Sequence, residues 1–209
     1  MSNPIAFPDT GVTQMAFDLI DPAKVARMEG RRTETAYDYE PYWQASFNLQ
    51  PQPNTDIGPL RRFLMRRGTF LAHDHSRPRP IAYAGSPLGG TKAGGGAFNG
   101  DVAINDLTAR NAPVITGLPA NFEFKVGDYI EFRQSAKVRS LHMIDADATA
   151  NSSGVTTLAL TTPVPSLFDT NDTAHLEKPS CVMQVLDKSM PLTLVNSTFS
   201  FDAVEAFPQ

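Results

Sequence analysis

Prolines and glycines interrupt this chain often, which favours many short strands over long helices. The 209 residues include 17 prolines and 14 glycines, and these two residue types end helices and mark turns. Apolar residues make up 41% of the sequence, which is enough to build a buried core. The sequence therefore predicts a mainly β protein made of many short strands.

Two N-terminal segments alternate with the period of two that a half-buried strand requires. In residues 43–49, Trp43 and Phe47 share one face with other apolar residues, and the residues between them are polar. Residues 32–39 alternate in the same way before Pro41. Together the two segments predict an antiparallel hairpin with one buried side.

One segment has helical spacing. Leu60, Phe63 and Leu64 recur at intervals of three and four residues, which predicts a short helix with an apolar stripe. Near the C-terminus, Phe199 and Phe201 fall on one face of a predicted strand. The residues that we expect in the core are Trp43, Phe47, Leu60, Phe63, Leu64, Phe199 and Phe201.

A glycine-rich run in residues 89–100 is the best linker candidate in the chain. Strand signals resume on both sides of it, and again after Pro179. We therefore expect a first domain formed by residues 1–88 and 179–209, a linker of residues 89–100, and an inserted small domain of residues 101–178.

Charge is distributed unevenly along the sequence. Residues 24–80 contain ten Lys and Arg against six Asp and Glu, whereas residues 81–209 contain eight against thirteen. Unlike charges of this kind can pair copies of one chain. The interface candidates are the helix arginines Arg61, Arg62, Arg66 and Arg67 and the aspartates Asp145 and Asp147.

Motifs for catalysis and cofactor binding are missing from the sequence. It contains no G-x-S-x-G, H-E-x-x-H or G-x-x-x-x-G-K-[ST]. His73 and His75 form a possible metal pair, with His142 or His175 as a third ligand, but a polar strand end is the better interpretation. We therefore expect no enzymatic activity, no cofactor and no metal.

Overall charge and cysteine content limit the partners and the compartment. A net charge of −4 argues against a dedicated nucleic-acid binder, because such proteins neutralise phosphates. The longest apolar run is far too short to span a membrane. The single cysteine, Cys181, rules out an internal disulfide framework, so we expect synthesis in a cytosol.

Two sets of short motifs follow each other along the sequence. The first set is Arg31, Arg32 and Glu34, then Tyr42, Trp43, Ala45 and Phe47, then Phe63, Leu64, Arg67, Gly68, Thr69 and Phe70. The second set is Gly127, Asp128, Tyr129, Ile130 and Phe132, then Arg139, Leu141 and His142, then Gly154, Leu158 and Leu160. The first set resembles the N-terminal part of the distal tail proteins of long-tailed, non-contractile phages and of gene transfer agents, and the second is similar to the β-barrel insert that many of these proteins carry.

The resemblance implies a split β-barrel belt domain with one short helix and an inserted small β-barrel. It also implies a homo-oligomer, usually a hexameric ring, at the tail tip of the virion. Such a ring joins the tail tube protein to the baseplate hub and the tail fibre proteins. Its subunits are made in the cytoplasm of the host.

Other functions remain open from the sequence. A carbohydrate- or receptor-binding β module would need exposed aromatic residues, which only Tyr37 and Tyr39 offer on a polar face. Another tail tube or tail-tip subunit would suit the same short motifs. A hydrolase with dispersed acids comes third, because the pairs Asp145/Asp147 and Glu29/Glu34 are ordinary charged pairs.

Overall fold

The computed structural model describes residues 3–5, 7, 11–27, 33–37, 40–53, 57–66, 68–189 and 196–207. Strands make up 43% of it and helices 6%, so the mainly β fold class predicted from the sequence is confirmed. None of the helices in these residues is both long and apolar enough to cross a lipid bilayer.

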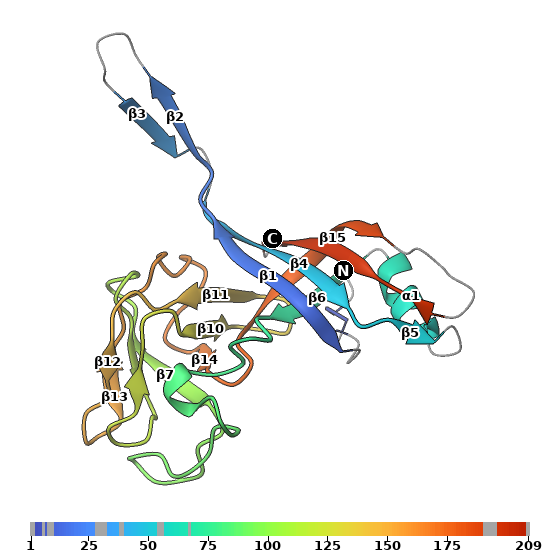
Figure 1. Cartoon of the computed structure of the whole chain (residues 1–209). Helices are drawn as coiled ribbons and strands as arrows, with labels where there is room; N and C mark the ends of the chain where they lie inside the picture. The colour runs from blue at the N-terminus through green and yellow to red at the C-terminus, as the bar shows by residue number, and fades with distance from the viewer. Residues whose placement is uncertain are drawn as a thin grey trace. The chain divides into compact units, whose positions relative to one another are not determined.

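The chain divides into two compact units, whose elements are labelled in Figure 1. Unit 1 contains Met1–Phe7, Gly68–Met183 and Ala206–Gln209. Unit 2 contains Pro8–Arg67 and Gln184–Glu205. The chain thus leaves unit 2 after residue 67 and returns to it after residue 183, whereas the sequence predicted the boundaries near residues 88 and 179.

An antiparallel sheet dominates unit 2. β1 (Val12–Ile20) pairs with β4 (Tyr42–Leu49), and β4 pairs on its other side with β17 (Ser200–Glu205). The sheet order is β1-β4-β17-β15-β6, with β15 spanning Ser180–Ser189 and β6 spanning Thr69–His73. The division between the units falls within β15, and β6 belongs to unit 1.

Two short strand pairs and one helix complete unit 2. β2 (Ala23–Arg27) pairs with β3 (Thr33–Tyr37), and β5 (Gln52–Pro53) pairs with β16 (Asn196–Ser197). The helix α1 spans Gly58–Met65, with proline in its first turn, where a missing N–H costs nothing. The β2–β3 ribbon continues beyond the ends of β1 and β4 (Figure 1).

The hairpin that the sequence predicted across Pro41 is wrong. β3 pairs with β2, whereas β4 lies between β1 and β17. The alternation of apolar and polar residues determines which face of a strand is buried, but it does not determine which strand lies beside it. The prediction therefore placed the buried face of β4 on the right residues and gave the strand the wrong neighbour.

The core of unit 2 forms where the buried face of β4 meets α1 and β17. Phe47 is 1% exposed and its ring stacks on Phe201, with centroids 4.8 Å apart. Phe63 of α1 contacts the Phe201 ring edge to face. All seven residues predicted for the core are buried: Trp43, Phe47, Leu60, Phe63, Leu64, Phe199 and Phe201.

Unit 1 is built on a six-stranded antiparallel sheet. Its order is β11-β10-β14-β7-β8-β13. The strands are β7 (Asp101–Asp106), β8 (Val114–Thr116), β10 (Tyr129–Arg133), β11 (Arg139–Met143), β13 (Val155–Thr157) and β14 (Thr173–His175). Two short strands, β9 (Glu123–Phe124) and β12 (Ala148–Thr149), pair separately, and the 3₁₀ helix η1 spans Ile81–Tyr83.

The sheets are not closed into barrels, which corrects the architecture implied by the resemblance. In unit 1 the segments that follow the two edge strands do meet. Ile144 forms an isolated bridge with Leu160, and the N–H of Asp145 donates to the carbonyl of Ala159 at 2.8 Å. A closed barrel needs a continuous ladder of strand pairs, and this single bridge does not provide one. The fold is therefore a strongly rolled open sheet around one apolar core.

The glycine-rich run is a folded part of unit 1 and not a linker. Phe98 is 3% exposed in the core, and its N–H donates to the carbonyl of Gly90 at 2.9 Å. The N–H of Ala93 donates to the carbonyl of Leu118 at 2.9 Å. Gly95 has a φ of +90°, in the left-handed region that favours glycine. The glycines therefore serve a tight turn that composition alone does not distinguish from a flexible linker.

Gly154 provides a test of how tightly unit 1 is packed. Its φ is +69°, and a Cβ atom there would collide with the carbonyl oxygen of Leu118. We expect Gly154→Ala to lower the free energy of unfolding by about 1–3 kcal/mol from backbone strain alone. Gly94→Ala is the control, because a Cβ there meets nothing within 4 Å. Equal stability of the two variants in chemical denaturation would contradict this packing.

Candidate functional site

The predicted arginine cluster lies on the exposed side of α1 in unit 2. Arg61, Arg62 and Arg66 are exposed, and none of them forms an ion pair with a described residue. Arg67 lies outside the described residues. Met65, between these arginines, is 52% exposed. This face of the helix therefore presents positive charge around one apolar side chain.

The predicted acidic partners lie in unit 1, and one of them already has a partner there. Asp147 accepts the N–H of Val126 at 2.9 Å and the ammonium of Lys125 at 3.1 Å. The Val126 N–H and then Lys125 lower the pKa of Asp147 below its usual value. Asp145 is exposed. Of the two acids, Asp145 is thus the one that forms no ion pair with a described residue.

The two histidines proposed as a metal pair do not converge on one point. The rings of His73 and His75 stack with their centroids 4.3 Å apart. Burial, and then the charge of His75, lower the pKa of His73 to about 4. Asp74 accepts hydrogen bonds from Ser76. In the described part of the chain, no group of three His, Cys, Asp or Glu residues is arranged to hold a metal ion.

His142 and His175, proposed from the sequence as third ligands, each contact other residues. His142 is fully buried, with Ser140 2.8 Å from its Nε2 and Thr162 3.0 Å from its Nδ1. Burial lowers its pKa to about 4. His175 contacts Asp101 on the neighbouring strand. Each of these imidazoles is held by residues of its own sheet or of the loop beside it.

Buried acids of unit 1 are occupied by hydrogen bonds. Glu131 is 0% exposed and accepts the N–H and hydroxyl of Ser180 at 2.9 and 3.0 Å. Arg133 and Arg139 donate to its other oxygen at 2.7 and 2.9 Å. A buried carboxylate that is fully paired in this way ties strands together. Neither of its oxygens lacks a donor.

The outer edge of β1 is the most conspicuous surface in unit 2. The N–H groups of Trp43 and Leu49 in β4 point toward the β17 side, to Glu205 and Phe199. Since the N–H groups of a strand alternate between its two sides, the neighbouring residues of β4 bond to β1.

The register then determines which residues of β1 face away from the sheet. Ala16 lies opposite Ser46, so its backbone groups bond to β4. Met15 and Leu19 are an odd number of positions away from Ala16, so their backbone N–H and C=O groups point away from β4. Neither of them forms a backbone hydrogen bond on that side with a described residue. β1 also lacks the lysines and prolines that protect exposed sheet edges.

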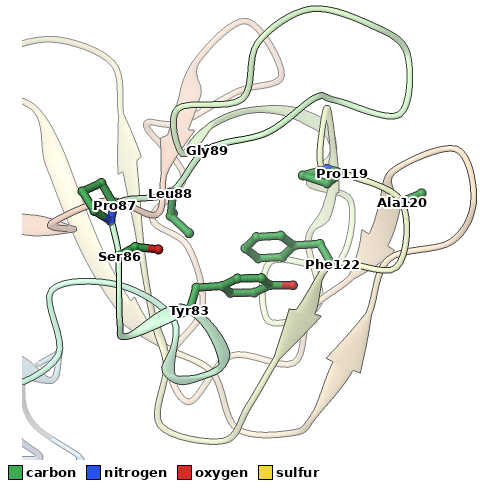
Figure 2. Close-up of a pocket in the computed structure, with 8 residues that line it drawn as sticks. All are labelled: Tyr83, Ser86, Pro87, Leu88, Gly89, Pro119, Ala120 and Phe122. Atoms are coloured by element: carbon green, nitrogen blue, oxygen red, sulfur yellow. The ribbon is translucent and has the colours of Figure 1, made fainter.

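A pocket of about 450 Å³ lies in unit 1, between the segment that follows η1 and the turn before β9 (Figure 2). The residues that line it are Tyr83, Ser86, Pro87, Leu88, Gly89, Pro119, Ala120 and Phe122. The ring of Tyr83 stacks on Phe122 with centroids 4.3 Å apart and planes within 11°. Its hydroxyl oxygen accepts the N–H of Glu123 at 3.0 Å.

The walls of this pocket are fixed by charged groups outside it. Arg79 forms a bidentate pair with Glu177, with distances of 3.1 and 2.5 Å to the two oxygens. The same carboxylate accepts the N–H of Leu88 at 3.0 Å. Asp128 accepts the N–H of Ile81 at 2.8 Å. The segment that carries Tyr83 and Leu88 is therefore attached to the sheet at both ends.

No family model matches this sequence, and no characterised protein matches it significantly.

The pocket in unit 1 was not predicted from the sequence. The prolines around residues 78–87 indicated a loop, but no pattern showed that Tyr83 would stack on a residue 39 positions later. Tyr39 and Glu29, named in the alternative interpretations, lie outside the described residues, as does the side chain of Tyr37.

The carboxylate of Glu205 in unit 2 should make the stability of the protein depend on pH. Burial raises the pKa of Glu205 to about 7, although its carboxylate accepts the N–H of Trp43. The folded chain therefore binds more protons than the unfolded chain between pH 4.5 and 7, and stability falls as pH rises through this window. The loss from this group is up to about 3 kcal/mol.

We expect Glu205→Gln to remove this contribution, because glutamine can accept the same hydrogen bond without a charge. The measurement is the difference in free energy of unfolding between variant and wild type from pH 4.5 to 7. A difference is needed because the lowered pKa values of His73 and His142 act in the opposite direction in this range. A constant difference across the window would show that Glu205 is ionised normally.

Proposed function

We propose that this chain is a structural subunit of a phage tail tip. Copies of it form a ring around the tail axis that joins the tail tube to the baseplate hub and fibres. The resemblance to distal tail proteins and the mainly β fold support this function. The observation that carries it is the open edge of β1, because a ring is held by contacts between copies.

A closed ring requires a heterologous interface, in which one surface of a copy meets a different surface of the next. β1 offers nine residues of edge strand, long enough for pairing with another strand. In unit 1, the outer side of β6 is covered by Ile5, whose N–H donates to the carbonyl of Thr69 at 2.9 Å. Protection of one edge strand and exposure of another is the pattern expected of a subunit that pairs in one direction.

The β2–β3 ribbon supports the same proposal. It is a two-stranded sheet with five paired positions, and no third strand joins it in the described residues. A two-stranded hairpin alone in water is marginally stable at best. A neighbouring copy or a tail protein that covers the ribbon would supply the missing contacts. The exposed arginines of α1 would then select partner and register, since each surface ion pair contributes only about 0–1 kcal/mol.

Proline substitutions in β1 test the proposal with a matched pair of variants. The N–H of Met15 faces away from β4, so Met15→Pro should leave the fold intact and remove an outward donor. Ala16→Pro removes an N–H that bonds to β4 and should destabilise unit 2 by about 3 kcal/mol or more. We expect Met15→Pro to unfold at nearly the same denaturant concentration as wild type, yet to be missing from assembled particles.

Electron microscopy of the particle that contains this chain is the readout. The proposal predicts several copies arranged around the axis at the end of the tail, and their loss from particles made with Met15→Pro. A single copy away from the axis would contradict the ring. Normal incorporation of Met15→Pro would contradict the role of the β1 edge.

A further inference from the structure

The pocket beside η1 has a lining that restricts what can bind there. None of its eight lining residues carries a charge. The strongest hydrogen bonds to phosphate and carboxylate ligands come from cationic side chains, which this lining lacks. The volume of about 450 Å³ lies within the range of small-molecule sites. The occupant that the lining favours is therefore a neutral molecule of limited size.

Three rings contribute to the accessible apolar lining. Tyr83 is half-buried and presents an aromatic ring, while Pro87 and Pro119 present pyrrolidine rings (Figure 2). Phe122 is only 2% exposed and supports the ring of Tyr83 from within the core. The face of an aromatic ring is negative and attracts polarised C–H groups. A ligand with one face of C–H groups matches such a surface. Leu88 adds an aliphatic side chain to the same wall.

Polar groups that no described residue contacts by a hydrogen bond lie on the same lining. The Ser86 hydroxyl forms no hydrogen bond with any described residue, and its side chain extends toward the rings of Tyr83 and Phe122 in Figure 2. The backbone N–H groups of Gly89 and Ala120 also have no acceptor in the described chain. A hydroxyl both donates and accepts, and an N–H donates. The pocket thus combines neutral donors with apolar rings.

We infer that this pocket binds one ring of a neutral carbohydrate. A sugar ring has a face of C–H groups and a rim of hydroxyl groups, which complement the rings and the unpartnered donors respectively. The attachment of Leu88 to Glu177 and of Tyr83 to Glu123 fixes the walls before binding. A preformed site loses less entropy when the ligand enters.

A proline-rich peptide fits this geometry less well. Such peptides insert their rings into slots between exposed aromatic side chains. Here Tyr83 and Phe122 stack directly on each other, with their ring centroids 4.3 Å apart, so no slot exists between them. Nucleic acid is disfavoured because no cation lines the pocket to meet a phosphate.

The test is a titration of the full ¹⁵N-labelled chain with three neutral oligosaccharides, maltotriose, cellotriose and chitotriose, at millimolar concentrations. Decaproline is titrated in parallel. We expect at least one sugar to shift the amide resonances of Ser86, Gly89 and Ala120. The experiment uses the isolated chain, so its outcome does not depend on whether the tail-tip proposal is right.

Three variants locate the binding. Tyr83→Ala should abolish it, and Ser86→Ala should weaken it about threefold to tenfold through the loss of one hydrogen bond. Ser86→Ala also guards against misfolding, because the hydroxyl of Ser86 forms no hydrogen bond with a described residue. Ile81→Ala is the control, since Ile81 is 44% exposed on η1 and does not line the pocket. It should bind like wild type.

The inference is overturned if none of the three sugars binds. It is also overturned if a sugar binds with equal affinity to wild type and Ser86→Ala. Tighter binding of decaproline at the same amides would assign the pocket to a proline-rich peptide instead.

Discussion

The need of every backbone N–H and C=O for a partner shapes both units of this protein. Where the strands of unit 1 end, side-chain carboxylates accept the hydrogen bonds that the sheet no longer provides. Asp128 accepts the N–H of Ile81, and Glu177 accepts that of Leu88. Glu131 does the same at the start of β15. These acids, each matched by donors, attach long irregular segments to the sheet and supply acceptors for backbone N–H groups at the attachment points.

At the outer side of β1, no described residue meets this requirement. The backbone groups of Met15 and Leu19 face away from β4, on a strand without lysine or proline. Exposed strands of this kind pair readily with other chains. The tail-tip proposal explains this surface, because the next copy in a ring would supply the missing partners. The pocket beside η1 is independent of this surface and points to a separate binding role.

The sequence predicts local features of this fold better than long-range ones. The alternation in residues 43–49 and the helical spacing of Leu60 and Phe63 identified side chains that are buried in unit 2. The strand beside β4 was predicted wrongly, because the alternation of apolar and polar residues carries no information about the partner strand. The glycine run was predicted to be a linker because glycine is common both in flexible linkers and in tight turns that need a positive φ. The pocket depends on Tyr83 meeting Phe122, a contact that no local pattern encodes.

Hydrogen exchange of the β1 amides tests the central claim, that another chain covers this edge in the assembled particle. The account predicts that the amides of Met15 and Leu19 exchange rapidly in the isolated subunit and become protected in the particle. The amide of Ala16 bonds to β4 and should be protected in both states, so it serves as an internal reference. Rapid exchange of Met15 and Leu19 in the particle would contradict the account.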